Sequence, residues 1–184
     1  MPTDRPFNFV HINKCGGSSV EIALGIPKRH AKASTLRDEI GADAWAQRFT
    51  FALVRNPFSR IVSIYYYRVR SAQGGMVDRH LNVNQWVEKV WGDRDPAYRD
   101  EQILFEPASD WVCADGEVIV NMVARLEDIA TAWPRITQEL GVNVPLRSLN
   151  RNLSPDYRDV LIPSARKLLE GAFREDLDRF GYTF

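Results

Sequence analysis

The chain has 184 residues, a length that suits one domain large enough to bury a hydrophobic core. Its 24 Lys and Arg residues balance its 24 Asp and Glu residues, which argues against non-specific nucleic-acid binding by a broadly basic surface. No apolar run reaches the roughly 20 residues of a transmembrane helix, and the N-terminus lacks the pattern of a signal peptide. The two cysteines, Cys15 and Cys113, have neither metal-site nor disulfide spacing, so we expect a reduced, cytoplasmic protein.

A strand buried on both faces is predicted over Phe7 to Ile12, and its end together with the polar turn that follows reads HINKCGGSS. Ser18 and Glu21 have the spacing of a capping box, at the start of a helix predicted to end near Gly25. A strand, a glycine turn and a helix N-terminus together form a cradle for a phosphate-like anion, and Lys14 lies within the turn. The same residues also fit an ordinary strand–turn–helix junction with a surface lysine. This stretch alone leaves both interpretations open.

A second strand–turn–helix unit follows the pattern of the first. Phe49 to Val54 is predicted to be a buried strand that runs directly into Arg55. Asn56 is a suitable N-cap, and Pro57 a suitable first residue, for the helix that follows. Because the carboxyl ends of parallel strands meet at one edge of a sheet, we expect the Arg55 turn to lie beside the Lys14 turn.

The rest of the chain is predicted to be mostly helical. Asp115 and Gly116 are a strong hairpin signal between two short strands, at 111–113 and 118–123. Pro134 is expected to kink its helix or to mark the true start of that helix. The predicted helices are 34–40, 42–48, 57–69, 83–91, a short one from 95 through 103, 126–140 and 163–180.

Strands that alternate with helices indicate an α/β fold with a mainly parallel sheet. We expect one P-loop-like three-layer domain over residues 1–184, in which helices flank a central sheet. Two anion-binding turns at one sheet edge suggest a ligand with two separated anionic groups. A kinase-type phosphate loop places its lysine after the glycines, whereas Lys14 precedes Gly16 and Gly17. No GxGxxG motif of a dinucleotide site is present.

Both turns resemble the signature loops of a known family. HINKCGGSS is similar to the HIPKTGGTS loop of sulfotransferases that use 3′-phosphoadenosine 5′-phosphosulfate (PAPS), and FALVRNPFSRIVSIYYY is similar to their VRNPxxRxxSxY signature. RHAKAS, VARLEDI and FREDLDRFGYTF also resemble segments of the carbohydrate-type branch, which includes heparan sulfate 2-O-sulfotransferases and small bacterial members. The motifs occur in the family's order and cover nearly the whole chain. The resemblance therefore implies a PAPS-dependent sulfotransferase.

The resemblance implies a nucleotide-binding role for both turns. Lys14 would contact the phosphosulfate bridge and stabilise the departing 5′-phosphate, so it is expected to be catalytic as well as cofactor-binding. Arg55 would clamp the 3′-phosphate with its fork of donors, and Ser63 would be the second contact to that phosphate. Arg60 is expected to be structural and paired with a carboxylate. The other residues expected to bind the nucleotide are Cys15, Gly16, Gly17, Ser18 and Ser19, through their N–H groups, and Arg151, in a loop that closes over it.

An acceptor hydroxyl needs a general base, and histidine is the natural choice near neutral pH. His11 lies in the first strand and is expected to be packed and hydrogen-bonded, while His80 precedes a helix beside a glycine-containing loop. By resemblance, His30 matches the histidine that acts as base in 2-O-sulfotransferases, so we expect His30 to be catalytic. Two residues depart from the family pattern, since Asn13 replaces the usual proline and Cys15 the usual threonine. Neither change removes a backbone donor, although Cys15 lacks a hydroxyl.

The expected partner is a hydroxyl-bearing acceptor, of the carbohydrate or glycolipid type, with no nucleic acid and no membrane span. Sulfuryl transfer needs no metal in this family, and the sequence shows no cluster of metal ligands. Two other functions remain open. One is a degenerate nucleotide-binding module without transfer activity, which the missing threonine at position 15 allows. The other is a small-molecule kinase, which the lysine-first order of the first turn disfavours.

Overall fold

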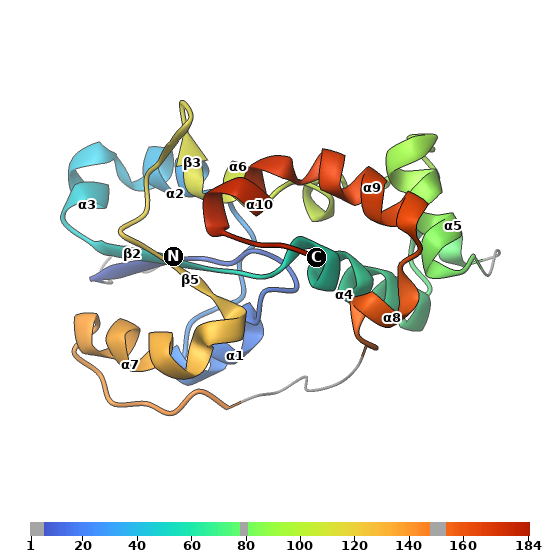
Figure 1. Cartoon of the computed structure of the whole chain (residues 1–184). Coiled ribbons are helices and arrows are strands. Elements are labelled where there is room, and N and C mark those ends of the chain that lie inside the picture. Colours follow the sequence, from blue (N-terminus) through green and yellow to red (C-terminus); the bar gives the residue numbers. More distant parts are fainter. Residues whose placement is uncertain (1–5, 78–80, 148–153) are drawn as a thin grey trace. The chain divides into compact units, whose positions relative to one another are not determined.

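The computed structural model describes residues 6–77, 81–147 and 154–184 (Figure 1). It divides into two compact units, the first made of Met1–Arg55 and Ala108–Leu149 and the second of Asn56–Pro107 and Asn150–Phe184. The single domain expected over residues 1–184 stays a prediction. Among the described helices, none combines the length and the apolar character that crossing a bilayer requires. His80 and Arg151 lie outside the described residues.

The first unit is built on a parallel three-stranded sheet in the order β1-β2-β5. The central strand β2 is buried beyond its first residue, as predicted, because it has a neighbour on each side. The prediction that the first strand would be buried on both faces is wrong, since β1 is an edge strand whose first three residues are half-buried. These strands are β1 (Phe7–Val10), β2 (Phe49–Val54) and β5 (Met122–Arg125).

Helices cover both faces of this sheet, which confirms the α/β class (Figure 1). Figure 1 shows α1 and α7 on one face and α2 and α3 on the other. Pro134 lies inside α7, which is preceded by a 3-10 helix at Leu126–Asp128. The helices of the first unit are α1 (Gly17–Leu24), α2 (Ala33–Ile40), α3 (Ala42–Ala46), α6 (Ser109–Val112) and α7 (Ile129–Glu139).

The predicted hairpin turn is confirmed, as strands β3 (Cys113–Ala114) and β4 (Glu117–Val118) pair antiparallel. The strand predicted over 111–113 is wrong for its first two residues, which lie in a helix that ends at Val112. Asp115 and Gly116 have φ angles of 52° and 81°, and two consecutive positive φ values are the mark of the type I′ turn that joins tight hairpins. The second half of the predicted strand 118–123 leaves this hairpin and becomes part of β5.

The second unit is helical, and its longest helix begins where the sequence predicts. The Asn56 side chain caps α4 (Pro57–Arg70) by accepting hydrogen bonds from the N–H groups of Phe58 and Ser59. The predicted helix 163–180 is broken at Phe173, and of the predicted helix from 95 to 103 only a short 3-10 turn forms. The other helices are α5 (Val83–Val87), a π-helix (Glu88–Gly92), 3-10 helices at Gly74–Met76 and Gln102–Leu104, α8 (Tyr157–Val160), α9 (Pro163–Ala172) and α10 (Arg174–Phe180).

Candidate functional site

The turn that follows β1 is shaped by residues in unusual backbone conformations. Lys14 has a φ of 63° and Gly16 a φ of 83°, so both lie in the left-handed region. A β-carbon at Gly16 would lie 2.7 Å from a methyl group of Leu126, and one at Gly17 would lie 2.0 Å from the His11 ring. The two glycines therefore let the start of α1 pack directly against the end of β1 and against Leu126.

The first turn of α1 provides donors for an anion. Among the described residues, none accepts a hydrogen bond from the N–H groups of Gly17 or Ser18, as is usual for the first residues of a helix. The N–H of Cys15 donates to Ile12, at 3.4 Å, and the N–H of Ser19 donates to Gly16, at 3.1 Å. Two of the five N–H groups that the sequence suggests as ligand donors are thus already bonded within the chain.

The predicted capping box is wrong. Helix α1 begins at Gly17, with Gly16 as its N-cap, and no side chain caps it, because the glycine pair turns the chain into the helix before the serines are reached. The carboxylate of Glu21 is buried, and its Oε1 lies 2.6 Å from Nδ1 of His11 and accepts the N–H of Arg29 at 3.2 Å. Glu21 therefore belongs to an interior network.

The two anion turns lie at one edge of the sheet, as predicted. Strands β1 and β2 are parallel neighbours, so the Lys14 turn and the Arg55 turn follow adjacent carboxyl ends. The Nη1 group of Arg55 donates a hydrogen bond to the carbonyl oxygen of Lys14, at 3.2 Å. The guanidinium of Arg55 is thus fixed against the turn that carries Lys14.

His11 is a packed, hydrogen-bonded residue, as expected. Its side chain is 3% exposed and donates from Nδ1 to the carboxylate of Glu21. Burial lowers the pKa of His11 below its usual 6.5, the charges of His30 and Lys28 lower it further, and the hydrogen bond to Glu21 opposes the shift. The lowered pKa favours the neutral form of the His11 ring, and the hydrogen bond to the Glu21 carboxylate places a proton on Nδ1.

His30 lies beside His11, with 4.2 Å between the ring centroids. Its Nδ1 is 3.0 Å from the carbonyl oxygen of His11, and because a carbonyl oxygen only accepts, Nδ1 carries the proton. In the neutral ring, Nε2 is then the atom with a lone pair. The edge of the His30 ring also meets Trp111, at 6.5 Å between centroids. The half-buried His30 side chain is thus oriented as a proton acceptor at Nε2.

The lowered pKa of His11 predicts a loss of stability in mild acid. The unfolded chain binds a proton at His11 near pH 6.5 and the folded chain does so only at lower pH, so the free energy of unfolding falls as the pH drops below 6.5. The expected slope is at most about 1.4 kcal/mol per pH unit. Urea unfolding between pH 7.5 and 5.5 measures it.

The matched variant for this experiment is His11→Asn, which keeps a donor toward Glu21 but does not titrate. Its overall stability is expected to be lower because the ring is lost, but its dependence on pH is expected to be shallower than that of the native chain. Parallel pH dependences for the two proteins would contradict the assignment.

The remaining predicted residues lie in the second unit. Ser63 is on α4 and is half-buried. Arg60 is structural, as expected, but its partners are the carbonyl oxygens of Glu106, at 2.7 Å, and Leu104, at 3.2 Å, instead of a carboxylate. Arg68 on α4 is also fully buried and pairs with Asp100, which the sequence did not predict. A charged residue within an amphipathic helix has no sequence signal that marks it as buried.

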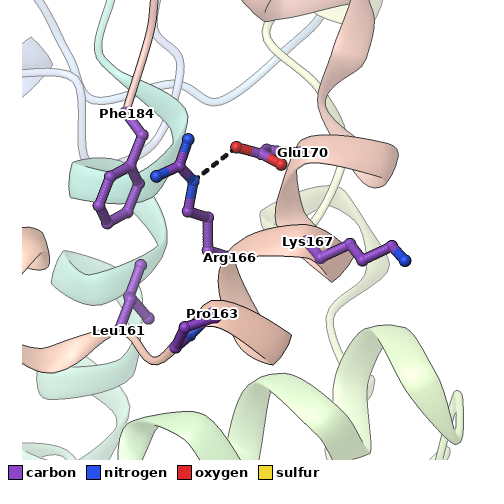
Figure 2. A pocket seen from close by; sticks show the side chains of 6 residues that line it. All are labelled: Leu161, Pro163, Arg166, Lys167, Glu170 and Phe184. Carbon is purple, nitrogen blue, oxygen red and sulfur yellow. Dashed lines mark hydrogen bonds and ion pairs between the residues drawn. The ribbon is translucent and has the colours of Figure 1, made fainter.

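A pocket of about 420 Å³ in the second unit contains none of the predicted site residues (Figure 2). Figure 2 shows Arg166 bonded to Glu170, with Phe184 beside it. The bond from Nε of Arg166 to the carboxylate is 2.6 Å long, and the guanidinium carbon lies 4.2 Å from the centre of the Phe184 ring. The charge of Arg166 is thus compensated within the pocket. The lining residues are Leu161, Pro163, Arg166, Lys167, Glu170 and Phe184.

Comparisons with known proteins identify the family and a similar fold. A family model described as "Sulfotransferase family" matches residues 4–183. Among solved structures, the chain is similar to a sulfotransferase from Alicyclobacillus acidocaldarius, with a TM-score of 0.53 over 96% of this chain and 94% of that one. The sequence identity is 18%, so this likeness shows a shared fold. No curated protein matches the chain.

Proposed function

The chain belongs to the sulfotransferase family, and we propose that it transfers a sulfuryl group from PAPS to a hydroxyl of a carbohydrate or glycolipid. The observation that carries this proposal is the hydrogen bond between Arg55 and the carbonyl of Lys14, which joins two cationic turns at the ends of neighbouring parallel strands. A ligand with two separated phosphate groups fits such a pair of turns.

We assign the 5′-phosphosulfate to the Lys14 turn. The N–H groups of Gly17 and Ser18 lie at the N-terminus of α1, where the helix dipole favours negative charge. The turn needs both glycines, because a β-carbon at Gly16 or Gly17 would collide with Leu126 or with the His11 ring. The ammonium of Lys14 would stabilise the charge that develops on the departing 5′-phosphate.

We assign the 3′-phosphate to Arg55. A guanidinium presents five N–H donors in a planar fork, and the bond to the Lys14 carbonyl holds that plane in place. The contact from Ser63 stays a prediction from the sequence signature, in which the serine follows the arginine by eight residues. The thiol of Cys15 has no part in this scheme, because it is buried and points to the carbonyl of Asn13, at 3.6 Å.

We assign the role of general base to His30. As the acceptor oxygen forms its bond to sulfur and the bond from sulfur to the bridging phosphate oxygen breaks, the hydroxyl proton moves to Nε2 of His30. The electron pair of the broken bond leaves with the 5′-phosphate next to Lys14. His30 then returns its proton to solvent.

Arg55 supplies the direct test of the nucleotide assignment. The Arg55→Ala variant is expected to bind 3′-phosphoadenosine 5′-phosphate (PAP) roughly 10- to 100-fold more weakly, because a charged hydrogen-bonding partner is lost. Arg55→Lys is expected to recover only part of the affinity, since an ammonium lacks the fork. Isothermal calorimetry measures both.

Arg135→Ala is the matched control, since Arg135 is exposed on α7 of the same unit. Equal PAP affinities for Arg55→Ala and Arg135→Ala would remove the 3′-phosphate assignment. A screen with labelled PAPS against carbohydrate, glycolipid and small hydroxyl acceptors then identifies the acceptor class. PAP binding without turnover on any acceptor would favour the degenerate nucleotide-binding module.

A further inference from the structure

The buried carboxylate of Glu21 joins three segments of the first unit. It projects from the middle of α1 and is 6% exposed. Its Oε1 accepts the Nδ1–H of His11, at the end of β1, and the backbone N–H of Arg29, in the segment between α1 and α2. One oxygen atom therefore fixes the strand end and the connection relative to the helix.

Both hydrogen-bond partners of Glu21 help to position His30. Arg29 directly precedes His30, so the bond from its N–H fixes the backbone on which His30 is carried. His11 holds His30 in a second way, because its carbonyl oxygen accepts the Nδ1–H of His30 at 3.0 Å. The position of the His30 ring thus depends on the Arg29 backbone and on the His11 carbonyl, and both residues are hydrogen-bonded to Glu21.

The same network extends to the phosphate cradle. The His11 ring lies directly against Gly17, where a β-carbon would come within 2.2 Å of its Nε2. Gly17 is the first residue of α1, so the ring that binds Glu21 also supports the start of the helix. A displaced His11 would alter both the anion-binding turn and the carbonyl that orients His30.

We propose that Glu21 is a positioning residue that holds His30 with its proton on Nδ1 and its lone pair on Nε2. The catalytic consequence rests on the proposed function, in which Nε2 of His30 takes the proton of the acceptor. Glu21 touches neither the acceptor nor the nucleotide in this scheme. It acts through His11 and Arg29.

Nuclear magnetic resonance of protein with 15N-labelled histidine tests the orientation without any sulfuryl transfer. In the native chain, neutral His30 is expected as the Nδ1–H tautomer. Glu21→Leu, which removes the acceptor at similar volume, is expected to give a mixture of tautomers at His30. Glu21→Gln, which keeps an oxygen for both N–H donors, is expected to keep the native tautomer. His30→Asn assigns the signal.

Glu39→Leu is the matched control, because the exposed carboxylate of Glu39 pairs with the side chain of Arg29, whereas Glu21 accepts the backbone N–H of Arg29. It is expected to leave the His30 tautomer unchanged. A native His30 tautomer in a folded Glu21→Leu protein would overturn the proposal. If that variant does not fold, hydrogen exchange of the Arg29 backbone amide in the native chain provides the test. The Arg29 N–H is expected to be protected, because it donates to Glu21. Fast exchange at Arg29 would overturn the proposal.

Kinetics separate positioning from a general structural role. Glu21→Leu is expected to lower kcat roughly 10-fold with a KM for PAPS within about threefold of the native value, and Glu21→Gln is expected to restore most of kcat. A Glu21→Leu protein with a changed KM for PAPS and a native kcat would contradict the proposal. A chain with no transferase activity would remove the proposed function, whereas the tautomer experiment would still decide whether Glu21 orients His30.

Discussion

Replacing His30 by alanine is expected to lower sulfuryl transfer by about 10²- to 10⁴-fold, the usual contribution of a positioned general base. The affinity for PAP is expected to stay within roughly threefold of the native value. His30 donates from Nδ1 to the His11 carbonyl, so its Nε2 is the atom that accepts a proton, and alanine offers no replacement. Transfer of labelled sulfate measures the rate, and calorimetry with PAP measures binding.

His30→Asn is the matched variant, because its amide can donate to the His11 carbonyl but cannot act as a base near neutral pH. Its rate is expected to be as low as that of His30→Ala, with a thermal stability closer to that of the native chain. Turnover within about threefold of the native rate in either variant would transfer the role of base to another residue. His80 or a carboxylate would then be the next candidate.

The second large effect is expected at Lys14. Lys14→Met keeps the length of the side chain but removes the ammonium, so kcat is expected to fall about 10²- to 10³-fold, as when one donor to a developing negative charge is lost. The affinity for PAP is expected to fall less than kcat does, because the charge on the leaving 5′-phosphate grows in the transition state. Steady-state rates with labelled PAPS measure this difference.

Lys14→Gly separates this catalytic effect from folding. Lys14 has a φ of 63°, and a left-handed conformation costs a residue with a side chain roughly 1–2 kcal/mol, which glycine avoids. Glycine in turn loses about 0.5–1 kcal/mol through its freedom in the unfolded chain. The free energy of unfolding is therefore expected to be unchanged or slightly higher, while turnover falls as in Lys14→Met.

Lys167→Ala is the control for both lysine variants, since Lys167 is exposed on α9. It is expected to have the native rate. A Lys14→Met protein that turns over PAPS at the rate of Lys167→Ala would contradict the catalytic role of Lys14. A large loss of stability in Lys14→Gly would indicate that the lysine is needed for the turn itself.

The elements that local signals specify were predicted well. Asn56 and Pro57 start α4 where the sequence indicates, because a cap and a fixed φ act within a few residues. Asp115 and Gly116 form the expected hairpin turn for the same reason. Strand β2 is buried as its apolar run predicts. The interruption at Phe173 was missed, although Gly171 lies two residues before it.

The start of α1 shows where local signals mislead. Ser18 and Glu21 fit a capping box, but the helix begins earlier, at the glycine pair, and Glu21 is drawn into the interior by His11 and Arg29. These partners lie 10 and 8 residues from Glu21 in the chain. A capping pattern reflects only residues within one helical turn, so it does not indicate when a residue on a distant strand competes for the same side chain.

The sequence by itself determined the order of strands and helices, the two cationic turns, and the lysine-first pattern that separates the HINKCGGSS loop from a kinase-type phosphate loop. These features depend on neighbours in the chain. Only the tertiary structure decided that Arg55 bonds to the Lys14 carbonyl, that His11 bonds to the buried Glu21, and that His30 presents Nε2. Such details depend on contacts between residues distant in sequence, which form only when β1, α1 and β2 pack together.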